Sequence, residues 1–269
     1  MQKLFIGLTF FWISQLSFSQ TPSIMKTIDT TLIPSFAPTG TLRVGINLGN
    51  PILANEDAAT HQLRGVTIDI AQEIGQRTKL PVQLIPFKTA GATVDAVKSG
   101  EVDLVFVAID PVRGADISYT PAYIQIEGAY MVKADSPLKK NEDVDISGNE
   151  IVVGKGSAYD LYLTREIQHA ALLRAASSQA VVDDFMSGKG NVAAGVKQQL
   201  ESDAKRYQDL RMLPGRFMVI NQAIGTPKAR PQYEDITAFL SEVIAQLKQS
   251  GFVAQALERH HIQGAKVAD

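Results

Sequence analysis

From Thr41 onward the chain alternates short apolar runs with helical patterns, and this alternation constrains the fold more than any other feature of the sequence. The first half predicts strand, helix, strand, helix and strand over residues 42–47, 67–78, 81–87, 93–100 and 102–108. Strands that alternate with helices pair in parallel through right-handed crossovers. We therefore expect an α/β unit built on a mainly parallel sheet.

The same order of elements begins again near Glu150. Strands are expected over 151–155, 171–176 and 191–196, and helices over 159–170, 177–190 and 197–208. An amphipathic helix over 233–251 and a shorter helix over 252–262 follow near the end of the chain. The pattern predicts two Rossmann-like lobes, with residues 41–128 and 222–269 in lobe 1 and residues 129–221 in lobe 2.

Two extended segments, 126–133 and 217–225, lie on either side of the second unit. If the C-terminal helices return to lobe 1, these segments are the two covalent connections between the lobes. Two lobes joined by two strands form a hinge, and ligands in such architectures bind in the cleft between the lobes.

The N-terminal 19 residues contain one Lys near the start, a nearly uncharged apolar run and small residues at Ser17 and Ser19. These features predict a signal peptide, with cleavage after Ser19. A retained membrane anchor is the alternative, although the apolar run is short for one. Residues 20–40 mix Thr, Ser and Pro without a period and predict a weakly packed N-terminal arm.

The absence of cysteine excludes a lipid-anchored lipoprotein, a disulfide and a thiolate metal site. We therefore expect the mature chain to be free in an extracytoplasmic space, most simply a bacterial periplasm. The four His residues show no metal-ligand spacing, and a net charge of −2 without a basic block gives no footprint for nucleic acid. A monomer without metal or cofactor is expected.

The stretch 99–123 places an arginine directly after a buried strand. The strand ends at Ala108, and Asp110 and Pro111 are favoured as the cap and first residue of a new helix. Arg113 would then lie beside the free N–H groups of a helix N-terminus, an arrangement that binds a carboxylate or a phosphate. The alternative is a surface arginine near a capped helix.

Five motifs in order resemble one family: RGVTIDIAQEIG, SGEVDLVFVAIDPVR, ISYTPAY, IVVGKGSAYDLYL and SGFVAQAL. Over about residues 41–262 the chain is similar to the polar-amino-acid class of periplasmic substrate-binding proteins of ABC importers. The resemblance implies a type II periplasmic-binding-protein fold with two lobes. It also implies capture of a small carboxylate-bearing solute, an amino acid or a similar compound, and its delivery to the membrane permease of an importer.

The resemblance also implies the residues of the site. Arg113 occupies the place of the arginine that grips the ligand's carboxylate, and the turn Gly156–Ser157–Ala158 matches the turn that offers backbone N–H groups and a hydroxyl. Asp110 stands where the family usually has Thr, so it is expected mainly as a cap. Further contacts are expected from Ala108 and from Asn47 and Asn50, in and after the first strand.

Two departures from the family pattern concern the ligand. The loop after the first strand has no aromatic residue, and Gly195–Val196 stands where the family has the aspartate that binds an α-ammonium group. A buried ammonium without an acidic partner is costly. Either the ligand lacks an ordinary α-amino group, or another acid takes this role. Glu127 is the best substitute, and a structural salt bridge in the hinge is its alternative role.

Three functions remain open at this point. The first is a binding protein without catalytic residues that serves an importer. The second is an enzyme on the same scaffold, similar to periplasmic cyclohexadienyl dehydratases, which needs a general acid in the cleft, either Glu127 or Asp110. The third is a free ligand-sensing module. No Walker motif or nucleophile elbow appears in the sequence, so we expect no enzyme.

Overall fold

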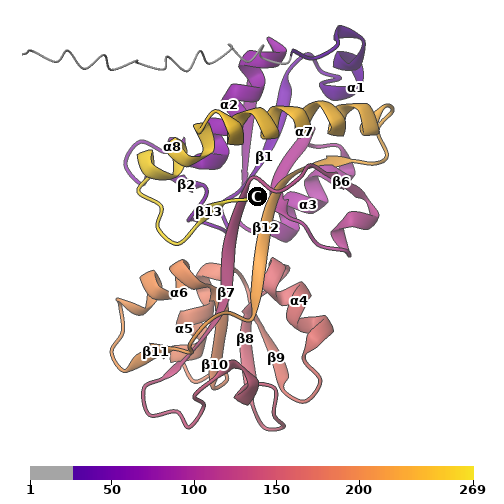
Figure 1. The fold of residues 1–269 in the computed structure, drawn as a ribbon. Coiled ribbons are helices and arrows are strands. Elements are labelled where there is room, and N and C mark those ends of the chain that lie inside the picture. The colour runs from indigo at the N-terminus through magenta and orange to yellow at the C-terminus, as the bar shows by residue number, and fades with distance from the viewer. Residues whose placement is uncertain (1–26) are drawn as a thin grey trace, which may run out of the picture.

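One mixed sheet runs through both lobes of the molecule, which is a computed structural model that describes residues 27–269 (Figure 1). The order of its main strands is β4-β1-β5-β12-β7-β10-β8-β9. The predicted signal peptide, residues 1–19, and the start of the predicted arm lie outside the described residues.

Lobe 1 holds the first strands and the two C-terminal helices (Figure 1). Its elements are α1 (Ile33–Phe36), β1 (Leu42–Asn47), β2 (Asn55–Glu56), β3 (Leu63–Arg64), α2 (Val66–Thr78), β4 (Val82–Phe87), α3 (Ala90–Ser99), β5 (Leu104–Ala108), β6 (Ile117–Tyr119), α7 (Tyr233–Gln249), α8 (Phe252–Arg259) and β13 (Lys266–Val267). Strand β1 pairs in parallel with β4 and with β5, as the alternation of strands and helices predicts.

Lobe 2 repeats this arrangement. Its elements are β8 (Glu150–Gly154), α4 (Ala158–Glu166), β9 (Ala171–Ala175), α5 (Val181–Met186), β10 (Val192–Val196), α6 (Lys197–Ala204) and β11 (Leu210–Met212). Strand β8 pairs in parallel with β9 and β10. The expected helix over 177–190 is shorter, because a 3-10 turn precedes α5, and Gly188 and Gly190 beyond its end adopt positive φ.

Two long strands pass from one lobe to the other, β7 (Ile124–Lys133) and β12 (Met218–Pro227) (Figure 1). They pair antiparallel with each other, with Met218 opposite Gly128 and Gln222 opposite Ile124. In lobe 1 β12 also pairs with β5, and in lobe 2 β7 pairs with β10. The predicted α/β fold of two lobes joined by a two-strand hinge is confirmed. The predicted lobe boundaries fall within these two strands.

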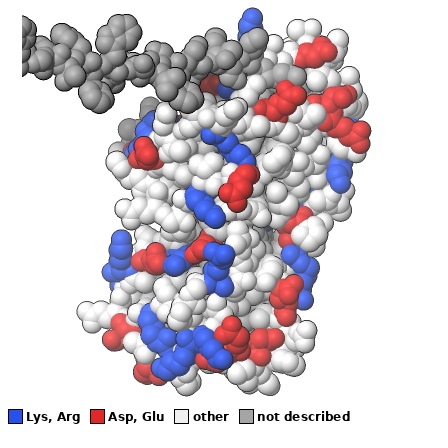
Figure 2. Space-filling view, in the orientation of Figure 1, with Lys and Arg blue, Asp and Glu red and all other residues white. Residues whose placement is uncertain are grey.

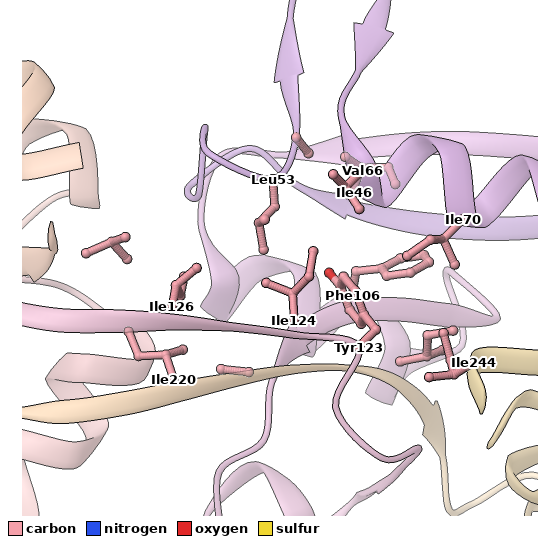
Figure 3. Close-up of a cluster of buried hydrophobic side chains, with 14 of the residues drawn as sticks. Ile46, Leu53, Val66, Ile70, Phe106, Tyr123, Ile124, Ile126, Ile220 and Ile244 are labelled. Carbon is pink, nitrogen blue, oxygen red and sulfur yellow. The ribbon is translucent and has the colours of Figure 1, made fainter. Parts of the chain in front are cut away.

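The apolar core continues from lobe 1 onto the hinge strands. Figure 3 shows Ile46 of β1 and Phe106 of β5 close to Tyr123 and Ile124, while Ile126 and Ile220 lie further along β7 and β12. All of these side chains are buried. The rings of Phe106 and Tyr123 meet edge to face, with 5.8 Å between their centroids. This packing fixes the lobe 1 end of the hinge.

The predicted weak packing of the arm is wrong for residues 28–37. Ile28, Leu32 and Phe36 are buried, and the Phe36 ring meets Phe239 of α7 edge to face at 6.4 Å. The Thr, Ser and Pro residues of the segment hide this contact, although Ile28, Leu32 and Phe36 are spaced four residues apart, which is a helical period.

The helix predicted after Asp110 is also wrong. The carboxylate of Asp110 does accept hydrogen bonds from the backbone N–H groups of Val112 and Arg113, at 2.9 and 3.4 Å. However, the segment forms only a 3-10 turn over Arg113–Ala115. The chain then enters β6, where buried Ile117 pairs with β12. Tertiary pairing therefore ends the helix that the local cap begins, and Arg113 does not lie in the first turn of an α-helix.

Candidate functional site

A cavity of about 30 Å³ lies between the lobes, at the ends of the parallel strands. It is lined by Asn47, Gly49, Asn50, Thr89, Ala90, Ala108, Arg113, Lys155, Ser157, Ala158, Tyr159, Ser178, Val196, Ile220 and Gln222. Most of these residues end β1, β5 or β10 or lie in the first few residues after β1, β4, β8 and β9. The carboxyl ends of parallel strands are where α/β folds place their ligands.

Arg113 is the buried cation of this cavity, with 5% of its surface exposed. Its guanidinium donates two hydrogen bonds to backbone carbonyls, from Nη1 to Ala108 O at 3.1 Å and from Nη2 to Gly156 O at 2.9 Å. The first acceptor belongs to lobe 1 and the second to lobe 2. A guanidinium has five N–H donors, so three remain for another partner.

Burial lowers the pKa of Arg113, because desolvation opposes its charged form. Arginine nevertheless keeps its charge in proteins. Among residues 27–269, no carboxylate lies within ion-pair distance of this guanidinium. A buried cation without an anionic partner is costly, so the site is suited to an anionic guest.

Ser157 begins α4 and also lines the cavity. Its Oγ accepts a hydrogen bond from Asp160 N at 3.0 Å, which makes it the cap of the helix. The expected N–H donors of the turn are already in use, since Gly156 N–H donates to Asp160 Oδ2 and Ser157 N–H donates to Gly154 O. The first N–H group of the helix proper is that of Ala158. Within this turn, the Ala158 N–H group and the Ser157 hydroxyl are the donors left for a ligand, and their contact with one stays a prediction.

Asp110 does not line the cavity. Its side chain is buried, and its Oδ2 lies 2.9 Å from Nη2 of Arg165 on α4. The other oxygen caps the turn before Arg113. With both oxygens occupied, Asp110 acts as a cap and as one half of an ion pair between the lobes.

Glu127 does not line the cavity either, so the structure does not bring the predicted substitute acid to this site. Its Oε1 accepts a hydrogen bond from Arg216 Nη1 at 2.6 Å, and its Oε2 lies 3.6 Å from Lys197 Nζ. The bond from Arg216 lowers the pKa of the Glu127 carboxyl. The alternative role, a salt bridge in the hinge, describes this residue.

Asn47 and Asn50 both line the cavity. The side-chain oxygen of Asn47 accepts a hydrogen bond from Gly49 N at 2.9 Å, which fixes the loop after β1. Asn50 is 7% exposed, and its Oδ1 has no hydrogen-bond partner among the described residues. A buried amide oxygen without a hydrogen-bond partner needs an explanation, and a donor group on a bound ligand would provide it.

Sequence reasoning missed several lining residues, including Lys155, Tyr159, Ser178 and Gln222. Lys155 directly follows β8 and has no ion-pair partner within residues 27–269. Tyr159 is an aromatic lining residue from lobe 2, and its hydroxyl donates a hydrogen bond to Ser178 Oγ at 2.9 Å. The rule of strand carboxyl ends, applied to β8 and β9, gives the signal that finds Lys155 and Ser178.

The two lobes also touch beside the cavity. Gln179 of lobe 2 donates a hydrogen bond from Nε2 to Leu48 O of lobe 1 at 2.7 Å. Together with the Arg113 to Gly156 and Arg165 to Asp110 contacts, it closes the cleft.

Comparison with protein families decides the class of protein. The family model described as bacterial extracellular solute-binding proteins, family 3, matches residues 42–263. The chain belongs to this family. The resemblance inferred from the motifs is thereby confirmed, and the cavity between the lobes of this solute-binding protein is its candidate binding site.

Solved structures match the fold of this solute-binding protein at low identity. A solute receptor for L-cysteine of Neisseria gonorrhoeae is 20% identical with a TM-score of 0.73, covering 86% of this chain and 94% of the receptor. A cysteine-binding protein from Campylobacter jejuni is 19% identical with a TM-score of 0.70, and the match covers 83% of this chain and 90% of that protein. A histidine kinase sensor domain is 17% identical with a TM-score of 0.72, and the match covers 85% of this chain and 98% of that domain. A search of curated proteins found no match.

Two further observations concern residues 27–269. None of their helices is long and apolar enough to cross a bilayer. No group of three or more His, Asp or Glu side chains among them is placed to hold a metal ion. Basic and acidic side chains both occur across the face that Figure 2 shows, and Lys and Arg side chains gather near its lower end, on lobe 2.

Proposed function

We propose that this protein captures a small carboxylate-bearing solute, an amino acid or a similar compound, between its lobes and delivers it to the permease of an ABC importer. It works without catalysis, as a monomer free in the periplasm. One observation carries the proposal: the charged guanidinium of Arg113 is buried between the lobes and forms no ion pair among the described residues, since the Asp110 carboxylate that acts on it electrostatically is paired with Arg165. A bound carboxylate would supply the missing anion.

Binding requires the lobes to move. The cavity of about 30 Å³ has room for roughly one water molecule, whereas small-molecule sites measure about 300–1,000 Å³. Strands β7 and β12 are the covalent links about which the lobes would open. Solute would enter the open form and be enclosed on closure, and the permease would distinguish the two forms.

A thermal-shift screen of the mature chain against carboxylates, with Arg113→Ala beside the wild type, tests the proposal. A carboxylate at about 100 times its Kd stabilises the wild type by about 2.7 kcal/mol, and this shift disappears in the variant. Arg206→Ala, which changes a half-exposed arginine on lobe 2, is the matched control and keeps the shift. An equal shift in Arg113→Ala, or no carboxylate that binds the wild type, would contradict the proposal.

The dehydratase alternative is disfavoured by the positions of the two acids that it needs. Asp110 is paired with Arg165 and Glu127 with Arg216, and neither lines the cavity. Absence of turnover of prephenate or arogenate by the purified chain would agree with a binding protein.

A free sensing module is a second candidate, favoured by the structural match to a histidine kinase sensor domain. Uptake of labelled solute by cells with and without the gene separates the two functions. Loss of uptake on deletion favours import, and unchanged uptake with an altered transcriptional response favours sensing.

A further inference from the structure

The charges that line the cavity are all of one sign. Arg113 and Lys155 line it, and no Asp or Glu does. Arg113 contributes a buried guanidinium with three unused donors. Lys155 is an exposed lining residue whose ammonium has no ion-pair partner in the described part of the chain, so it is free to turn toward a guest. Two cations at one site favour a guest with more than one negative group.

The nearest acids are not available to a guest. Asp110 is paired with Arg165, and Glu127 with Arg216. Asp160 accepts hydrogen bonds from Gly156 N–H at 2.8 Å and from Arg174 Nε at 3.0 Å. Drawing any of the three into the cavity would leave a cation or an N–H group without its partner, which costs more than the original bond contributes.

Apolar side chains form part of the cavity wall. Val196, at the end of β10, and Ile220 of β12 both line the cavity. Val196 is buried. An ammonium group enclosed against these two side chains would lose its water without gaining an anion. The side-chain oxygen of Asn50 offers a neutral acceptor for an N–H or O–H donor, but it does not balance a charge.

We propose that the solute is a small dicarboxylate without an ammonium group, with one carboxylate on Arg113 and the other facing Lys155. The proposal rests on the proposed function, since it takes the cavity to be the solute site. It decides between the two alternatives that the sequence left open, in favour of a ligand without an α-amino group.

Matched ligand pairs test this proposal on the wild-type chain by calorimetry. The pairs are succinate with L-aspartate and 2-oxoglutarate with L-glutamate, and L-lysine and putrescine serve as cationic ligands. The amine-free member of a pair is expected to bind at least about tenfold more tightly, since an unpaired ammonium loses a charged hydrogen bond. The cationic ligands are expected to give no binding heat.

Substitutions at two positions make the test specific to the residues. Lys155→Met is expected to weaken the binding of succinate by about tenfold. The affinity for propionate, which has one carboxylate, is expected to stay nearly unchanged. Val196→Asp places an acid on the apolar wall and is expected to reverse the preference within each pair. Val196→Asn, of the same shape without the charge, is expected not to reverse it. Circular dichroism shows whether each variant is folded.

The possible outcomes separate this inference from the proposed function. If L-aspartate or L-glutamate binds more tightly than its amine-free partner, and Arg113→Ala abolishes that binding, the dicarboxylate inference is wrong and the solute-binding function stands. If no carboxylate binds, the proposed function is wrong as well. The comparison of ligand pairs uses the wild type alone, so misfolding of a variant does not affect it.

Discussion

The guanidinium of Arg165 on lobe 2 lies 2.9 Å from the buried carboxylate of Asp110 on lobe 1. This ion pair joins the lobes without entering the cavity, so it stabilises closure whether or not a solute is present. Opening the cleft would separate the pair and expose Asp110 to water.

Replacing Arg165 therefore shifts the chain toward the open form. For Arg165→Met we expect a larger radius of gyration in small-angle scattering without solute, and faster association and dissociation of solute in stopped flow. Arg174→Met is the matched control, since Arg174 pairs with Asp160 inside lobe 2 and spans no cleft. An unchanged radius in Arg165→Met would show that this pair does not hold the lobes together.

Ser157 caps α4, and the proposed function gives it a second role as a donor to the solute; two substitutions separate these roles. Ser157→Ala removes the cap of α4 and is expected to lower the free energy of unfolding by about 1 kcal/mol, whereas Ser157→Gly costs only a few tenths. Solute affinity is expected to fall in both variants by about 1 kcal/mol, because both lack the hydroxyl. Urea unfolding and calorimetry measure the two effects. Full affinity in Ser157→Gly would limit this residue to capping.

The Glu127–Arg216 ion pair in the hinge makes the free energy of unfolding depend on pH. The bond from Arg216 lowers the pKa of Glu127 in the folded chain, so the stabilisation is complete above the ordinary pKa of about 4.3 and is lost as pH falls through the lowered folded value. Glu127→Gln is expected to cost about 0.5 kcal/mol at pH 7, since the pair is partly exposed.

Urea unfolding of wild type and Glu127→Gln at pH 7 and at about pH 3 measures this term. The difference between the two proteins should vanish at the lower pH. A difference that stays constant across this range would mean that the ion pair contributes nothing.

The contact between Phe36 and Phe239 makes the N-terminal segment part of the folded lobe. Phe36 is 1% exposed, so Phe36→Ala is expected to lower the free energy of unfolding by about 3 kcal/mol or more. Ile146→Ala is the control, because Ile146 is 53% exposed and its truncation should cost less than about 0.5 kcal/mol. Similar losses in the two variants would contradict the packing of this segment.

The fold could be predicted because its elements carry local signals. Thr89 caps α3 with its side chain, and Gly100 ends that helix in the left-handed conformation, so the boundaries agree with the pattern to within a few residues. The helix expected after Asp110 failed because the pairing of Ile117 with β12 is set far along the chain, where no local pattern indicates it.

The site could be predicted only in part. Arg113, Asn47 and Asn50 were found from the resemblance, and each does line the cavity. The role of Glu127 could not be read from its neighbours, because its partner Arg216 lies on the other side of the hinge, 89 residues later. Lys155 was overlooked although it follows a strand, since a lone lysine in a glycine-rich turn resembles any solvated residue.

The ladder between β7 and β12 has a consequence for how the molecule is put together. Because Gly128 and Met218 are directly opposite each other, the chain leaves lobe 1 and re-enters it at adjacent residues. Lobe 2 is therefore an insertion into lobe 1, and its two ends lie side by side on neighbouring strands. Another lobe of the same kind could replace lobe 2 without changes to lobe 1, provided that its two end strands keep the register of β7 and β12.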